Sequence, residues 1–161
     1  MKISPLKQRD ESACGPTTIE MVLKYFNIKH SYKEIATVSK YKEEEGFSNT
    51  DIVYTLKKFD LNVKEKINTQ WSDLAFYNKK NNVIILSWML DGYIGHVSVL
   101  EKITKSHIYL ADPHTGTTKK IQKIVFMRLW MDYDGMWYPV KNTDIQLRWM
   151  CVASKKKTRS R

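Results

Sequence analysis

The chain has 161 residues, of which 42% are hydrophobic and 27% are charged. This size and composition suit one folded domain, and they exclude both two independent cores and a disordered chain. The longest apolar stretch, from Val83 to Leu90, is about half the length that a membrane-spanning helix needs. The first residues also lack the apolar run of a secretory signal. We therefore expect a cytoplasmic protein with no membrane span.

Positive charge is concentrated at the end of the chain. The formal net charge is +10, and the stretch from Lys155 to Arg161 carries five positive charges and no acid. Two alternatives follow: a contact with a polyanion, or a solvated surface with a charged terminus. Because no nucleic-acid-binding motif accompanies the charge, we favour the second and expect no nucleic-acid partner. We predict a single domain over residues 1–154 and a basic, disordered tail over residues 155–161.

The first half of the chain has the pattern of short amphipathic helices. Pro16 suits the first turn of a helix, and apolar residues then recur at helical spacing as far as Phe26, so this helix should end near Asn27. Three further helix starts are indicated, at Ser31 with Glu34, at Ser48 with Asp51 and at Ser72.

From Val83 onwards, β-branched and aromatic residues dominate, which is typical of strands. Strands are predicted over Val83–Met89, Gly95–Ile103, His107–Ala111, Thr117–Ile121 and Asp144–Ala153, with a helix over Gln122–Trp130. The segment from Asp112 to Gly116 reads as a turn, because proline fixes φ and glycine allows positive φ. The order of elements predicts an α+β fold with helices first, an antiparallel sheet after them, and a cleft between two lobes.

Cys14 directly precedes Gly15, Pro16 and the first predicted helix, so its thiol should lie at a helix N-terminus. The helix dipole and the unpaired N–H groups there favour a thiolate, which is a nucleophile for acyl transfer. The alternative is that Cys14 is a small buried hydrophobic residue. The second cysteine, Cys151, has no motif beside it, and zinc-binding spacings are lacking, so we expect two free thiols and no metal.

One of the four histidines, His96, has a predicted carboxylate partner. In a hairpin centred on Thr104, residues whose numbers sum to 208 lie opposite each other, which pairs His96 with Asp112. A carboxylate so placed orients an imidazole. A one-residue slip would separate the two side chains onto opposite faces, and an exposed pair without a catalytic role is the alternative. The remaining histidines fit loop or surface positions, with His114 close to the candidate site: His30, His107 and His114.

Gln8 lies six residues before Cys14. Thiol proteases stabilise the tetrahedral oxyanion with two donors, commonly the backbone N–H of the cysteine and a side-chain amide upstream of it. Gln8 could supply that amide, and its alternative role is that of an exposed polar residue in an N-terminal segment.

These motifs together resemble the bacteriocin-processing cysteine peptidase family, whose fold is papain-like. The resemblance covers roughly residues 3–132 and rests on the order of Gln8, Cys14-Gly15-Pro16, Gly46-x-Ser48-x-x-Asp51-Ile52, His96-Val97-Ser98-Val99 and Ala111-Asp112-Pro113-x-x-Gly116. It implies an N-terminal helical lobe and a C-terminal antiparallel sheet lobe. The best-known members are N-terminal domains of ABC transporters that remove double-glycine leader peptides, and others stand alone. Trp130-Met131-Asp132 resembles the end of the stand-alone members.

Carried over by motif, the resemblance implies that Cys14 is the nucleophile and His96 the general base and then acid. It also implies that Asp112 orients His96 and that Gln8 is an oxyanion donor. No transporter membrane segment or nucleotide-binding cassette follows in this sequence. We therefore expect a peptide or protein substrate, with a separate exporter as a candidate partner and leader cleavage as a candidate role. We expect no cofactor.

Three functions remain open at this stage. The first is a papain-like cysteine peptidase that forms an acyl-enzyme on Cys14. The second is a catalytically silent peptide-binding module of the same fold, which the presence of Cys14, His96 and Asp112 argues against. The third is an acyl or amide transferase that uses the same three residues, since one fold can host several acyl-transfer reactions.

Overall fold

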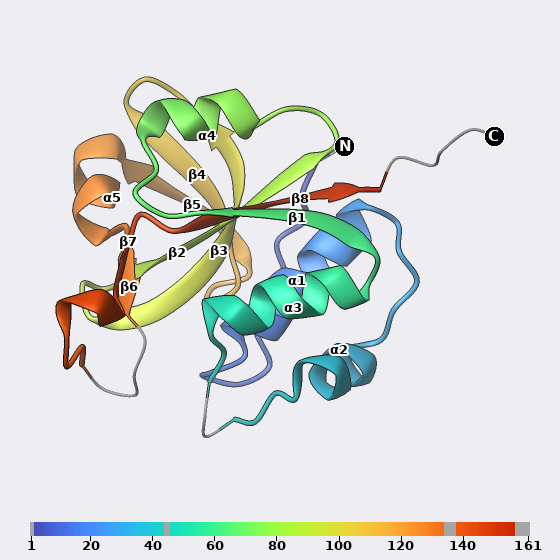
Figure 1. Cartoon of the computed structure of the whole chain (residues 1–161). Coiled ribbons are helices and arrows are strands. Elements are labelled where there is room, and N and C mark those ends of the chain that lie inside the picture. Colours follow the sequence, from blue (N-terminus) through green and yellow to red (C-terminus); the bar gives the residue numbers. More distant parts are fainter. Residues whose placement is uncertain (1, 44–45, 134–137, 157–161) are drawn as a thin grey trace.

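The computed structural model describes residues 2–43, 46–133 and 138–156. Its centre is a six-stranded antiparallel sheet in the order β1-β8-β2-β3-β4-β5 (Figure 1). The strands of this sheet are β1 (Leu61–Lys66), β2 (Asn82–Leu90), β3 (Ile94–Ile103), β4 (His107–Asp112), β5 (Thr117–Gln122) and β8 (Met150–Lys155). A separate two-stranded ribbon pairs β6 (Met131–Tyr133) with β7 (Ile145–Leu147), after a 3₁₀ turn (Asn142–Asp144).

Helices cover both faces of the sheet (Figure 1). One face packs against α1 (Cys14–Tyr25), α2 (Tyr32–Ser39) and α3 (Asn49–Lys58), and the other against α4 (Trp71–Tyr77) and α5 (Lys123–Leu129). The helices predicted from the sequence are all present, and Ser31 and Ser48 cap α2 and α3 as expected. The mixed helix and antiparallel sheet class is therefore confirmed.

The predicted strands correspond to β2, β3, β4 and β5 within two residues at each end. The last predicted strand, residues 144–153, is wrong in one respect, because it is divided into β7 and β8. Arg148 breaks it with a φ of 50°, in the left-handed region that extended chains do not enter. Strands β1 and β6 were not predicted. Lys155, which we assigned to the basic tail, is the last residue of β8, and residues 157–161 of that tail lie outside the described residues.

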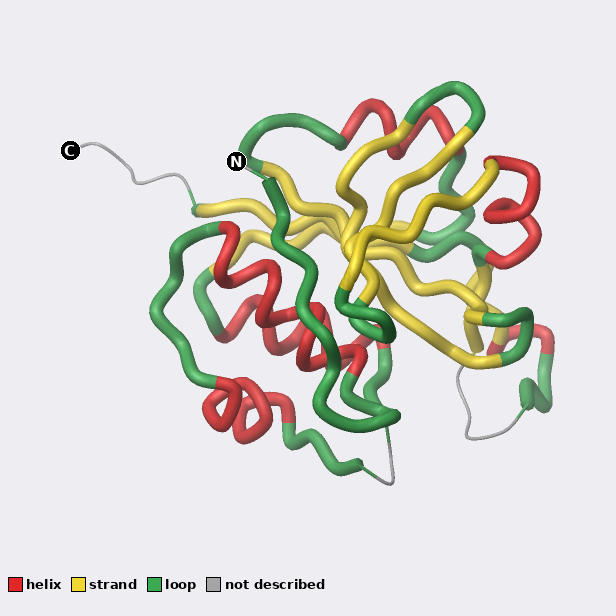
Figure 2. Tube along the Cα trace, turned by 180° about the vertical axis from the view of Figure 1, so that it is seen from behind, coloured by secondary structure: helices red, strands yellow, loops and turns green. Residues whose placement is uncertain are grey.

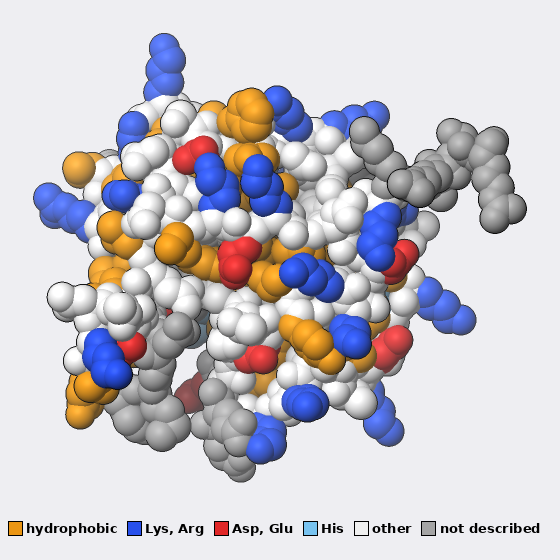
Figure 3. Space-filling view, viewed as in Figure 1, with side chains coloured by type: hydrophobic (Ala, Val, Ile, Leu, Met, Phe, Trp, Pro, Cys, Tyr) orange, Lys and Arg blue, Asp and Glu red, His pale blue; other side chains and the backbone are white. Residues whose placement is uncertain are grey.

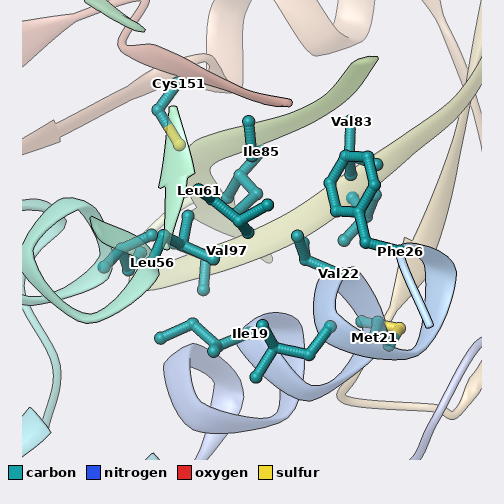
Figure 4. Close-up of a cluster of buried hydrophobic side chains, with 14 of the residues drawn as sticks. Ile19, Met21, Val22, Phe26, Leu56, Leu61, Val83, Ile85, Val97 and Cys151 are labelled. Carbon is teal, nitrogen blue, oxygen red and sulfur yellow. The ribbon is translucent and has the colours of Figure 1, made fainter. Parts of the chain in front are cut away.

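Successive residues of the central strands point to opposite faces of the sheet and so belong to two separate hydrophobic cores. Ile85 and Val97 point towards α1, where they meet Ile19 and Val22 (Figure 4). The opposite face builds a second core around three large aromatic side chains and the residues of α4 and α5: Trp88, Phe126 and Trp130. The sheet is thus held from both sides, which fixes the strands that carry the candidate site.

Strands β3 and β4 form the predicted hairpin, but their register changes along it. Near the turn, Lys102 pairs with Tyr109, so the two residue numbers sum to 211. Further along, Val99 pairs with Ala111, which gives a sum of 210. The change occurs because Glu101 is an extra residue that bulges out of the ladder.

This bulge decides which face of the sheet receives Asp112. Without the extra residue, the ladder would set Asp112 opposite Val99, on the face away from His96. With it, the register of Val99 and Ala111, continued by one residue, puts Asp112 on the same face as Ser98 and His96. Our prediction that His96 and Asp112 are directly opposed is therefore wrong. The true register differs by two residues, which preserves the alternation of faces, and the two side chains meet in a hydrogen bond.

The N-terminal segment is tied to the turn between β4 and β5. The backbone N–H of Gln8 donates to the carbonyl oxygen of Pro113 at 2.8 Å. Gly116 has a φ of 71°, and a Cβ atom there would lie only 2.8 Å from the side chain of Lys7. Figure 2 shows the segment as the loop that runs from the N-terminus past the helices before α1 begins. The predicted turn therefore positions Gln8 as well as Asp112.

None of the helices in the described part of the chain is long and apolar enough to cross a membrane.

Gly15 should be intolerant of any side chain. Gly15→Ala would place a methyl carbon 2.3 Å from the Phe47 ring. We expect the free energy of unfolding to fall by about 1–3 kcal/mol, the usual cost of overpacking, in urea denaturation. Phe47→Ala in the same chain should relieve that clash, so the two substitutions should be strongly non-additive. If the two losses of unfolding free energy were additive, Phe47 would not pack against Gly15 as described.

Candidate active site

Cys14 is the first residue of α1, and the packing of that helix against β3 sets its position. The hydroxyl of Thr18, one turn after Cys14, donates to the carbonyl oxygen of Val97 at 3.4 Å. Gly15 is needed next to Cys14 because Phe47 packs directly against its backbone. The thiol therefore lies beside Val97, the residue that follows His96 in β3.

Two opposing effects act on the Cys14 thiol. Burial raises the pKa of Cys14 to about 11, while backbone hydrogen bonds from Val97, Gly15 and Cys14 itself act to lower it. The charge of Asp132 adds to the increase in this pKa. We expected the helix N-terminus to favour the thiolate, but burial is the larger effect. The sulfur is therefore a protonated thiol at neutral pH until a base removes its proton.

His96 is held by a buried carboxylate. Its Nε2 atom lies 2.6 Å from Oδ1 of Asp112, and the exposed fractions of the two residues are 4% and 0%. Because Nε2 is engaged by Asp112, Nδ1 is the ring nitrogen that remains to exchange a proton with a thiol. The arrangement matches the role of an acid that fixes the orientation and tautomer of an imidazole.

Asp112 stays ionised despite its burial. Burial alone would raise its pKa, but the hydrogen bond and charge of His96, the backbone N–H of His114 and the ammonium of Lys119 bring the pKa below its usual value. The N–H of His114 donates at 3.2 Å, and Nζ of Lys119 lies 4.0 Å from Oδ2. The His114 ring, which is exposed, also stands edge-on to the His96 ring. His114 therefore contacts both His96 and Asp112 from the exposed side of the site.

The large side chains before His96 do not all have the same environment. Trp88 and Met89 are buried, whereas Tyr93 is 73% exposed. The Trp88 ring packs edge-on against the His96 ring at 5.5 Å, and its Nε1 donates to the hydroxyl of Ser98. Trp88 thus forms part of the core and supports the imidazole.

Gln8 reaches the site region, but its amide is engaged locally. Its Nε2 donates to the carbonyl oxygens of Asp10 at 2.8 Å and Glu11 at 3.0 Å, which occupies both amide hydrogens. Its Oε1 is buried and has no hydrogen-bond partner among the described residues. Donation to an oxyanion would therefore require one of these two bonds to exchange.

Asp132 is a residue near the thiol for which we predicted no role in the site from the sequence. It lies in β6, where the hydroxyl of Ser87 and the side-chain amide of Asn49 donate to its Oδ2. Only the tertiary structure brings α3, β2 and β6 together, so no local pattern indicates this cluster. Figure 3 shows the surface hollowed on the side where the β6–β7 ribbon faces the start of α3.

The described residues contain no group of His, Cys, Asp or Glu side chains that could hold a metal ion. Both cysteines are free thiols, as expected.

Solved structures of peptidase domains share this architecture. The peptidase domain of Streptococcus ComA, an ABC transporter, superimposes with a TM-score of 0.71 at 17% identity, over 96% of this chain and 99% of that chain. A double-glycine-motif protease from an AMS/PCAT transporter, in complex with its leader peptide, gives 0.70 at 16% identity, over 96% and 94%. A C39-like peptidase from Bacillus anthracis gives 0.67 at 13% identity, over 98% of each chain. The fold is therefore that of the papain-like cysteine peptidases.

The sequence also identifies the family within this class. Residues 2–134 match the Peptidase C39 family, so the chain belongs to that family and is a cysteine peptidase. The resemblance noted from the sequence motifs is thus confirmed. A search of the curated proteins found no match to this sequence.

The two thiols should differ in reactivity. Cys14 is partly exposed at a helix N-terminus, whereas Cys151 is completely buried and burial raises its pKa strongly. We expect iodoacetamide to alkylate Cys14 first in the folded protein, as read by peptide mass spectrometry, and Cys151 only after unfolding. The rate at Cys14 should keep rising with pH towards about 11 in His96→Ala, because burial holds the thiol protonated. Faster labelling of Cys151 would contradict the assignment of the nucleophile.

Proposed function

We propose that this peptidase cleaves its substrate with Cys14 as nucleophile, His96 as general base and acid, and Asp112 as the residue that orients His96. The observation that supports it most is the buried bond between His96 Nε2 and Asp112 Oδ1 at 2.6 Å. It leaves Nδ1 of the imidazole to act on the thiol, which the adjacent Val97 holds by a backbone hydrogen bond. A base, an orienting acid and a nucleophile on separate elements form the usual set for acyl transfer.

The reaction then follows from the protonation states. Nδ1 of His96 takes the proton of the Cys14 thiol as the sulfur attacks the peptide carbonyl carbon. The tetrahedral intermediate collapses, the C–N bond breaks, and His96 returns the proton to the leaving amine. Water then gives a proton to His96 and adds its hydroxyl to the thioester. The acid product leaves, and the proton returns to the sulfur.

The oxyanion of both intermediates needs hydrogen-bond donors. The backbone N–H of Cys14 is one, because the first N–H groups of a helix have no partner within it. We propose that Gln8 supplies the other by exchanging one of its bonds to the carbonyl oxygens of Asp10 and Glu11. The anchor between Gln8 and Pro113 keeps its side chain next to the β4–β5 turn that carries Asp112.

Double-glycine leader peptides are the substrate class that we propose first. The support is the similarity of the whole chain to two peptidase domains of transporters, one of them solved with a leader peptide. A separate exporter would be the matching partner. The transferase alternative shares the acylation step and differs in that an amine, rather than water, accepts the acyl group.

A peptide library decides between these functions. Short peptides that include Gly-Gly sequences would be incubated with the wild type and with Cys14→Ala under reducing conditions, and products would be identified by mass spectrometry. We expect Cys14-dependent cleavage after Gly-Gly. Cleavage at other sequences would show that double-glycine leaders are not the substrate class. Products joined to an added amine would favour the transferase. The absence of any Cys14-dependent product would favour a binding module and contradict the proposal.

The best peptide from that library would then be used to rank the site residues. Cys14→Ala and His96→Ala should abolish turnover, whereas Asp112→Asn should leave a residue of activity, because an orienting acid is less absolute than a nucleophile or base. Gln8→Ala should lower kcat by about 100-fold or more. A wild-type kcat in Gln8→Ala would show that this residue does not serve the oxyanion.

A further inference from the structure

We infer that Asp132 is a specificity-determining residue of this site, and that its carboxylate binds an ammonium or guanidinium group of the substrate close to the scissile bond. The inference rests on the proposed function and adds the chemical class of a substrate side chain to it: a lysine or arginine.

The carboxylate of Asp132 is held in one place by donors from three parts of the chain. The hydroxyl of Ser87 and the side-chain amide of Asn49 donate to Oδ2, the latter at 3.4 Å. The backbone N–H of Tyr133 donates to Oδ1 at 2.9 Å. Ser87 and Asn49 are 0% and 5% exposed, so these supports belong to the interior and not to a mobile surface. Donors of this kind orient a carboxylate.

This carboxylate lies next to the reacting groups. A Cβ atom on Gly95 would be 3.3 Å from Oδ1 of Asp132, and Gly95 immediately precedes His96. Ser87 pairs directly with Val97, whose backbone hydrogen-bonds the Cys14 thiol. The pair of Ser87 and Val97 thus connects the two groups, because Ser87 contacts Asp132 and Val97 contacts the thiol. Gly95 is exposed and has no side chain, so no Cβ atom of this residue stands next to Oδ1.

Besides the donors that hold Asp132, two amide oxygens belong to the same cluster. The side-chain amide of Asn49 donates to Oε1 of Gln146 at 2.8 Å as well as to Asp132. That leaves Oδ1 of Asn49 buried without a hydrogen-bond partner among the described residues. Reversing this amide would set its oxygen against two other oxygens, so the observed orientation is the stable one. A site built from a carboxylate and amide oxygens suits a cationic N–H donor.

The charge of Asp132 also gives such a cation an effect on catalysis. A negative charge close to the thiol opposes formation of the thiolate, and the effect of Asp132 on the pKa of Cys14 has that sign. A substrate cation bound to Asp132 would offset this charge when the thiol must ionise. Cationic substrates should therefore gain in kcat/KM and not only in affinity.

The alternative is that Asp132 only joins β6 to β2 and α3. A purely structural role would make Asp132→Asn equally harmful to every substrate. A role in specificity would make the effect depend on the charge of the substrate.

The experiment uses a peptide set in which lysine, norleucine or glutamate is placed in turn at each position flanking the scissile bond. Lysine and norleucine have side chains of similar length, so their ratio isolates the charge. In the wild type, we expect at least one position where lysine exceeds norleucine in kcat/KM by about 10-fold. Asp132→Asn should reduce this ratio to about one, and the norleucine peptide should be cleaved no more slowly than by the wild type, because the charge that opposes the thiolate is removed. Asp91→Asn, which removes an exposed acid in the β2–β3 turn, should leave the ratio unchanged.

A lysine preference that survives Asp132→Asn would overturn the inference, and so would equal losses on all peptides. A wild type that cleaves peptides without any charge preference would also overturn it and leave the proposed peptidase function intact. If no peptide is cleaved, the proposed function fails, and binding decides the inference separately. Fluorescent lysine peptides should then bind Cys14→Ala about 10-fold more tightly than Cys14→Ala/Asp132→Asn, and equal binding would contradict the role of Asp132.

Discussion

The hydrogen bond between His96 and Asp112 is the interaction on which the rest of the site depends. Both groups are almost completely removed from water, and leaving either one buried without the other costs about 3–5 kcal/mol. The fold meets this constraint with three local features. The bulge at Glu101 sets the face of Asp112, Trp88 supports the imidazole, and the turn ending at Gly116 supplies the N–H of His114.

The same turn connects the pair to Cys14, the proposed nucleophile. Its Pro113 carbonyl holds Gln8, and the segment from Gln8 leads within six residues to Cys14 at the start of α1. Burial keeps the Cys14 thiol protonated, while backbone N–H groups and Asp132 act on it in opposite directions. A thiol balanced in this way is unreactive without a base. In the proposed mechanism, a rigid base thus acts on a nucleophile whose ionisation is controlled by its surroundings.

The parts of this structure that could be predicted from the sequence are those with strong local patterns. Capping residues and apolar spacing indicate α1 to α3, and β-branched runs indicate β2 to β5. Strand β1 was missed because it is an edge strand with charged residues, and its partner β8 is far away in the sequence. The break at Arg148 carries no glycine or proline to mark it.

Within the site, the sequence could predict that His96 and Asp112 lie on the same face of the sheet, because side chains alternate between faces along a strand. The bulge that sets the actual register has no signal in the sequence. Asp132 was missed because its neighbours Asn49, Ser87 and Gly95 meet it only in the folded chain.

The most direct test of the central claim is the protonation of His96, measured by ¹⁵N NMR of the imidazole in histidine-labelled protein, with His96→Ala to assign the signals. We predict that the tautomer of the neutral ring carries its proton on Nε2, facing Asp112, and leaves Nδ1 bare to accept the thiol proton. Asp112→Asn should weaken this tautomer preference. A proton fixed on Nδ1 of the neutral ring would contradict the assignment of His96 as the base of this peptidase.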